Sequence, residues 1–301
     1  MQRRNFIKNT ILATGALTLP LAGNELYAGS SAITSPAVTN FRKAIMWGSI
    51  SMRDSSVNDI CKVIKAAGFA GVEPRSQMDR KEVIDAMKSN GLIVSSVCWS
   101  GKRSVSSPDA TARQEWVEET IIALEDAHAY GTDAILLVPG SVNENVAYDE
   151  CWNRSVEGIK KVLPTAKKLK VQICVENVWN NFLLSPMEAA RYVDQFKSPY
   201  VKFYFDCGNY CHIGWPEQWI RILGNRIGRI HIKEYSRQVA AGNARNGFNV
   251  KLGEGDINWT KVLAEASKVY QGGWLVTEQG SSRSLEDMKD LNERFDKILR
   301  S

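Results

Sequence analysis

The stretch VQICVEN (residues 171–177) is a short, β-branched run with an ionisable residue near its carboxyl end, and three later runs repeat this pattern. They read VKFYFDCGN (201–209), IGRIHIKEY (227–235) and GWLVTEQG (273–280). A longer segment with helical periodicity follows each one, and short apolar runs of this kind are typical of buried strands in a parallel sheet. The pattern therefore predicts a strand–helix repeat with polar groups at the carboxyl ends of the strands.

The same alternation extends upstream to about residue 41. Four further strand candidates are KAIMWGS (43–49), AGVEPR (70–75), IVSSVCW (93–99) and DAILLVPG (133–140). Strands begin about 33 residues apart, which is the size of a βαβ unit. Eight such units close as a (β/α)₈ barrel, so we predict a single-domain α/β TIM barrel over residues 41–301.

An open doubly wound sheet is the structural alternative to a barrel. No G-x-G-x-x-G follows a strand candidate, which argues against the dinucleotide-binding form of that fold. Among the intervening helices, the fourth contains Pro164, which predicts a kink or an early end there.

Length and composition limit the class of protein. The chain has 301 residues, of which 44% are hydrophobic and 24% charged, an ordinary globular composition. No apolar run reaches the roughly 20 residues that a membrane-spanning helix needs. The net charge is +5, and the first 28 residues account for +2 of it. The remaining +3 predicts neither nucleic acid nor a membrane surface as a partner of the mature protein.

The first 28 residues have the three parts of an export signal. QRRNFIKNT is charged, ILATGALTLPLAG is moderately apolar, and NELYA ends in the small residue Ala28. The Arg3–Arg4 pair resembles a twin-arginine signal, which makes the twin-arginine export machinery a partner. We expect cleavage after Ala28, a linker over residues 29–40, and a periplasmic or otherwise exported mature protein. The alternative is an amphipathic N-terminal helix of the mature fold.

The six cysteines are interpreted as buried thiols rather than disulfides. Cys98, Cys174 and Cys207 lie inside apolar, strand-like runs, where a thiol behaves as a small hydrophobe. The twin-arginine route carries proteins that have already folded in a reducing cytosol, where free thiols persist.

The last four strand candidates each carry one metal-type ligand at the carboxyl end, where barrel active sites lie. Alternation along a strand decides which way each side chain points. Phe205 naturally faces the helices, so Asp206 faces the barrel, and Ile232 likewise turns its neighbour His231 inward. The four inward-facing candidates are Glu176, Asp206, His231 and Glu278.

Any one of these carboxylates alone could be a solvated cap or part of an ion pair. Three of them in one small space would repel strongly without a cation, so together they predict a metal site. Three carboxylates and one imidazole form an oxygen-rich set that suits Mn²⁺ best, with Mg²⁺, Co²⁺ or Zn²⁺ as alternatives. Structural zinc sites prefer thiolates, so the site is catalytic in type.

The ends of these four strands, with GEGDINW (253–259), resemble the xylose isomerase-like barrel family. Within that family the chain is most similar to sugar-phosphate isomerases/epimerases and ketose 3-epimerases, from about residue 41 to the end. The resemblance implies that Glu176 and Glu278 both bind the metal and transfer protons, and that Asp206 and His231 complete the ligand set. HIKEYSR (231–237) matches a family pattern that ends in a substrate-binding arginine, here Arg237.

Two positions depart from the epimerase pattern. Ketose 3-epimerases often have a histidine three residues after the sixth-strand aspartate, where this chain has Asn209 and then His212 three residues later. The acidic residue that some members place six residues after the fifth-strand glutamate is Phe182 here. We therefore treat Asn209 and His212 as candidate substrate contacts of a sugar that the sequence does not name.

Other residues at strand ends are candidate substrate contacts by type. Trp47, Trp99 and Trp179 end the first, third and fifth strands, where aromatic faces stack on sugar rings or pack in the core. Lys233 could bind an anionic substrate or brace a ligating carboxylate. Glu73 ends the second strand and could bond a sugar hydroxyl or Arg75.

The predicted chemistry is proton transfer at a carbon beside a carbonyl. A cation acidifies this proton, and a carboxylate removes it from a ketose or keto-sugar to give a cis-enediolate. A second carboxylate returns it on the opposite face to give an epimer, or at the other carbon to give an aldose–ketose isomer. We therefore expect a metal-dependent sugar isomerase or epimerase.

Three alternatives remain at this point. A leaving group one carbon further on would turn the same first step into β-elimination from a keto-glycoside. A non-catalytic exported sugar-binding barrel is the second alternative. A nuclease related to endonuclease IV is the third, but three histidines are too few for its metal cluster. Export favours a free or oxidised sugar over a phosphorylated one as the substrate. The sequence does not decide whether the protein forms a homo-oligomer.

We predict that the exported protein begins near Gly29. N-terminal sequencing of protein purified from its natural compartment measures this directly. An intact Met1 on soluble cytosolic protein would contradict the export interpretation.

Overall fold

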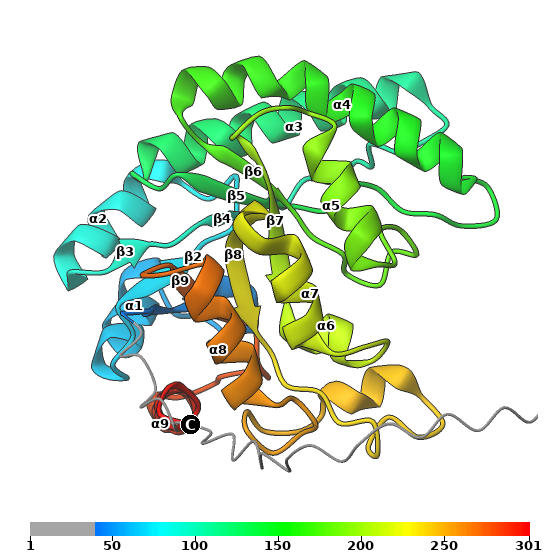
Figure 1. Ribbon diagram of the computed structural model, residues 1–301. Helices are drawn as coiled ribbons and strands as arrows, with labels where there is room; N and C mark the ends of the chain where they lie inside the picture. The colour runs from blue at the N-terminus through cyan, green and yellow to red at the C-terminus, as the bar shows by residue number, and fades with distance from the viewer. Residues whose placement is uncertain (1–39) are drawn as a thin grey trace, which may run out of the picture. The chain divides into compact units, whose positions relative to one another are not determined.

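Nine strand segments of the computed structural model form one all-parallel sheet that curves into a barrel (Figure 1). The structure describes residues 40–301, so the expected signal and nearly all of the expected linker lie outside the described residues. The strands are β1 Arg42–Met46, β2 Gly71–Glu73, β3 Ile93–Val94, β4 Val97–Cys98, β5 Ala134–Leu137, β6 Gln172–Val175, β7 Val201–Asp206, β8 Ile227–Ile232 and β9 Trp274–Thr277.

The barrel closes through the third of the eight predicted strands, which is divided into β3 and β4. The sheet order runs β3-β2-β1-β9-β8-β7-β6-β5-β4, so β3 and β4 form its two ends and are consecutive in the chain. Ser95 and Ser96 separate them. The backbone N–H of Cys98 donates to the carbonyl of Pro74 at 2.8 Å, which joins β4 to the segment after β2. The predicted (β/α)₈ barrel is confirmed.

Helices cover the outer side of the sheet (Figure 1). They are α1 Val57–Ala66, α2 Arg80–Asn90, α3 Ala110–Ala129, α4 Tyr148–Leu169, α5 Pro186–Asp194, α6 Cys207–Cys211, α7 Pro216–Leu223, α8 Trp259–Val269 and α9 Leu285–Leu299. Short 3₁₀ turns span Trp47–Ser49, Gly224–Arg226 and Ala244–Phe248. The short helix α6 was not predicted, and it begins directly after the candidate ligand Asp206.

Helix α4 continues through Pro164 to Leu169, so the early end expected at this proline does not occur. A proline inside a helix removes one backbone hydrogen bond, at a cost of about 3 kcal/mol. The helix spans 22 residues and buries an apolar face that includes Ile159, Val162 and Leu163. Tertiary packing of that face therefore outweighs the local penalty.

The strands divide the apolar residues into two layers by alternation. Phe203 and Phe205 of β7 join the large cluster between sheet and helices, whereas Tyr204 lies in the smaller cluster inside the barrel. Leu275 and Val276 of β9 divide in the same way. Inward residues of β7 and β8 therefore include Asp206 and His231, as the alternation predicted.

All six cysteines are free, which confirms their interpretation as thiols. None of the helices formed by residues 40–301 is both long and apolar enough to cross a membrane.

Candidate metal and acid–base site

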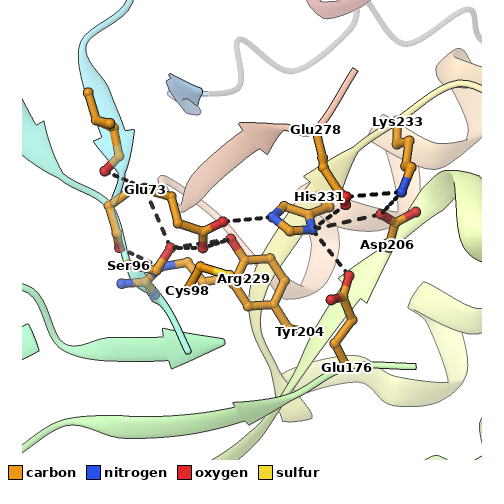
Figure 2. Close-up of polar contacts among 12 residues, drawn as sticks. Glu73, Ser96, Cys98, Glu176, Tyr204, Asp206, Arg229, His231, Lys233 and Glu278 are labelled. Atoms are coloured by element: carbon orange, nitrogen blue, oxygen red, sulfur yellow. Dashed lines mark hydrogen bonds and ion pairs between the residues drawn. The ribbon is translucent and has the colours of Figure 1, made fainter. Parts of the chain in front are cut away.

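Four neighbouring strands bring four ligand-type side chains together at their carboxyl ends (Figure 2). Glu176 follows β6, Asp206 ends β7, His231 lies in β8, and Glu278 follows β9. One donor atom from each lies within 4.8 Å of the others. Asp206 and His231 are directly paired in the sheet register, and His231 pairs with Val276 of β9. Parallel pairing of adjacent strands is thus what aligns the four residues.

The imidazole of His231 lies at the centre of this group. Its Nδ1 is 3.1 Å from Glu176 Oε1, 3.3 Å from Glu278 Oε2 and 3.7 Å from Asp206 Oδ2. His231 and Asp206 are fully buried, Glu176 is 2% exposed, and the Glu278 side chain is 26% exposed. Glu278 is therefore the ligand that reaches the mouth of the barrel.

Burial and like charge set the ionisation of the carboxyl groups. Burial raises the pKa of Asp206 to about 8 and also raises the pKa of Glu176. Burial acts in the same direction on Glu278, but Lys233 and His231 outweigh it and hold the pKa of that carboxyl well below its usual range. Without a cation, the group therefore depends on protons and on two cationic side chains to reduce its repulsion.

The residues present fit a divalent cation. Asp206 Oδ2 is buried and has no hydrogen-bond partner, so one lone-pair donor points into the group unsatisfied. Three carboxylates and one imidazole nitrogen are a donor set typical of catalytic divalent metals. Glu176, Asp206, His231 and Glu278 could therefore hold such an ion.

Lys233 lies beside two of the candidate ligands. Its Nζ is 3.2 Å from Glu278 Oε1 and 3.8 Å from Asp206 Oδ2, and it lies 4.6 Å from the ring centroid of Phe248. Asn209 is also at the site, because its backbone N–H donates to Asp206 Oδ1 at 2.7 Å. Lys233 thus braces two of the candidate ligands, Asp206 and Glu278.

Trp179 and His212 belong to an aromatic cluster with Tyr235 and Phe248. The Trp179 ring lies 4.9 Å from the His212 ring and 5.0 Å from the Phe248 ring, and its Nε1–H donates to the carbonyl of Asn209. His212 Nδ1 is 2.7 Å from the hydroxyl of Tyr235. The cluster thus connects Asn209 and Lys233, which contact the candidate ligands, to the exposed His212. The Trp179 ring is in contact with the rings of His212 and Phe248.

Three of the four remaining candidate contacts, Trp47, Trp99 and Arg237, have partners other than the four candidate ligands. Trp47 is half-buried and packs against the outer core, and the Trp99 ring lies 6.4 Å from that of Trp116 on α3. Arg237 is exposed, and its guanidinium donates to the carbonyl of Gly214 at 2.7 Å.

Glu73 occupies a different position from the one expected. It is fully buried, and its partners are His231, Ser96 and Tyr204 rather than Arg75. Because β2 ends inside the barrel beside His231, both carboxylate oxygens are engaged there, and a contact with a sugar hydroxyl does not fit this position.

Glu234 is a structural residue of the site that sequence reasoning missed. Its carboxylate accepts hydrogen bonds from the backbone N–H groups of Tyr235, Gly253 and Ile257 and from the indole of Trp259. Its own backbone N–H donates to Gln279 Oε1 at 2.6 Å. It therefore ties the long connection between β8 and α8, which carries Phe248, to the strand ends. The signal was the GEGDINW segment, whose Gly253, Ile257 and Trp259 supply three of the four donors.

Comparison with known proteins gives a family match and several relatives. The model of the family described as "Xylose isomerase-like TIM barrel" matches residues 61–298. The D-psicose 3-epimerase of Agrobacterium fabrum is 26% identical over 217 residues, which cover 68% of this chain and 74% of the relative. The putative L-ribulose-5-phosphate 3-epimerase of Escherichia coli is 26% identical over 219 residues, which cover 70% and 76%.

A solved structure shows the same fold. A D-tagatose 3-epimerase-like protein superposes with a TM-score of 0.73 at 17% identity, covering 86% of this chain and 97% of the other.

We predict that Glu234→Gln loosens the β8–α8 connection. An amide replaces one acceptor oxygen with an NH₂ group that meets N–H donors, and a buried unsatisfied donor costs about 1–3 kcal/mol. Hydrogen–deuterium exchange should therefore accelerate in residues 236–258. Glu293→Gln, at an exposed position on α9, is the control and should leave this segment unchanged. Equal exchange in both variants would contradict the assigned role.

Proposed function

Because the chain belongs to the xylose isomerase-like TIM barrel family, we propose that it is a metal-dependent sugar epimerase. The observation that carries this proposal is the convergence of Glu176, Asp206, His231 and Glu278 within 4.8 Å at the barrel mouth. The 3-epimerase names of the two relatives support the same reaction class.

The ion that we propose is Mn²⁺, with Mg²⁺, Co²⁺ or Zn²⁺ as alternatives. When bound, it would supply the positive charge that polarises a sugar carbonyl and acidifies the neighbouring C–H. All four side chains would hold it, and Lys233 would keep Glu278 in place through their 3.2 Å contact.

Glu176 and Glu278 are the proposed proton-transfer pair. They extend from β6 and β9, which β7 and β8 separate in the sheet, so they approach a bound sugar from different sides. One carboxylate takes the proton from the carbon beside the carbonyl. The electron pair of that C–H bond forms a C=C bond, and the π pair of the carbonyl moves to its oxygen. The other carboxyl group returns a proton on the opposite face, which inverts the carbon without any redox partner.

Product analysis separates this reaction from the two alternatives. A proton returned at the other carbon gives an aldose–ketose isomer, and loss of a group from the next carbon gives elimination. We propose that Lys233, Asn209 and His212 bind the sugar. Lys233 contacts Glu278, Asn209 contacts Asp206, and His212 packs against the Trp179 ring, whose indole donates to the Asn209 carbonyl. From the twin-arginine-like N-terminus we further propose export, and thus a free or oxidised sugar as substrate.

We predict one equivalent of divalent metal per chain, held in part by His231. Elemental analysis after Mn²⁺ loading and desalting should give a ratio of about one for the natural sequence and much less for His231→Ala, since an imidazole ligand is lost. His128→Ala is the control, because His128 lies on α3 and contacts the carbonyl of Leu169. Equal metal content in all three proteins would contradict the site.

We predict that Glu176→Gln and Glu278→Gln each reduce proton exchange by about 10²–10⁴-fold, the usual effect of losing a general base. The assay follows deuterium incorporation beside the carbonyl of a panel of ketoses and keto-glycosides in deuterated water with Mn²⁺. Metal content must be measured in parallel, because both residues are also proposed ligands. A metal-replete Glu278→Gln protein that exchanges at the unmodified rate would overturn the two-base mechanism, and a metal-replete natural protein without any exchange would favour a binding protein.

A further inference from the structure

Glu73 lies on the opposite side of the His231 ring from Glu176, Asp206 and Glu278 (Figure 2). It is the last residue of β2 and is 0% exposed. Its Oε2 is 3.0 Å from His231 Nε2, although 158 residues separate the two in the chain. The same imidazole therefore has one nitrogen toward the proposed cation site and the other toward Glu73.

Two hydroxyl groups orient the Glu73 carboxylate. Ser96 donates to its Oε1 at 2.7 Å, and Tyr204 donates to the same oxygen at 2.8 Å. Ser96 lies at the interruption between β3 and β4, and Tyr204 lies on β7 two residues before Asp206. The Tyr204 ring also packs against the His231 ring with 4.3 Å between centroids. Side chains from β7, from β8 and from the break between β3 and β4 thus converge on one buried carboxylate.

Ser96 and Tyr204 both donate to the Glu73 carboxyl group, so it acts as an acceptor in this cluster. When its Oε2 also accepts from His231, the hydrogen of that contact lies on Nε2. In a neutral imidazole, Nδ1 then carries the lone pair, and Nδ1 is the atom next to Glu176, Asp206 and Glu278. We propose that Glu73 is a positioning residue that fixes the tautomer and ring orientation of His231 so that Nδ1 can bind the cation. This inference rests on the proposed metal site and adds a residue that the four ligands do not include.

The burial of Glu73 distinguishes a positioning role from a catalytic one. Glu73 lies inside the barrel with no exposed surface, and His231 stands between it and the other ligands, so it does not contact the sugar. Its effect must reach the reaction through the affinity for metal. Partners that orient a metal-ligating histidine in this way typically contribute 10–100-fold to metal affinity.

The test is the dissociation constant of Mn²⁺, measured from the electron paramagnetic resonance signal of the free ion. Glu73→Gln should weaken binding by about 10–100-fold. An amide can turn its NH₂ group toward Nε2, which favours the tautomer with hydrogen on Nδ1. Tyr204→Phe keeps the ring beside His231 and removes only the hydroxyl, so it should weaken binding by less than Glu73→Gln.

Asp126→Asn is the matched control. Asp126 on α3 is a carboxylate that is 1% exposed and accepts hydrogen bonds from the Gln77 backbone and the Arg80 side chain. Its loss should lower thermal stability and leave the Mn²⁺ dissociation constant unchanged, which separates loss of a buried carboxylate from loss of the His231 partner.

The outcomes separate the inference from the proposed function. A natural protein that binds no Mn²⁺ would overturn the metal site itself. A natural protein that binds Mn²⁺, together with a folded Glu73→Gln variant of equal affinity, would overturn only the role of Glu73. If Glu73→Gln does not fold, Tyr204→Phe decides: weaker binding than in Asp126→Asn supports the role, and equal binding overturns it.

Discussion

Mutual repulsion among the carboxylates of Glu176, Asp206 and Glu278 is the constraint that the neighbouring residues at the barrel mouth must offset. Three carboxylates that each have an oxygen within 4.8 Å of the others, and that are largely removed from water, destabilise one another. His231 lies among them, Lys233 lies against two of them, and burial raises the pKa of Asp206 to about 8. Apolar side chains at these positions would avoid this repulsion, and the arrangement as it stands is one that could hold a cation.

The barrel holds these charges in place through two sets of supports. On the Nε2 side of His231, Glu73 accepts hydrogen bonds from Ser96 and Tyr204 and holds the imidazole. Glu234 anchors the β8–α8 connection through four hydrogen bonds, and this connection brings Phe248 against Lys233. The break between β3 and β4 contributes to this support, because Ser96 lies in the break and donates a hydrogen bond to Glu73.

Much of the fold and the clustering of the four candidate ligands could be predicted from the sequence, because both depend on local pattern. Short apolar runs at regular spacing identified the strands, and strand alternation placed Asp206 and His231 inside the barrel. The supports could not be predicted in this way. Glu73 and His231 are 158 residues apart, and nothing in GVEPR distinguishes a residue that contacts His231 from one that faces a sugar. Glu234 follows Lys233 directly, and only the folded path of residues 253–259 brings its partners together.

The most direct test of this account is a crystal structure of the protein soaked with Mn²⁺, with data collected at the manganese absorption edge. The account predicts a single strong anomalous peak bounded by Glu176, Asp206, Glu278 and Nδ1 of His231, with Nε2 still bonded to Glu73. A peak at another place in the barrel, a peak on Nε2 of His231, or no peak at saturating Mn²⁺ would contradict it.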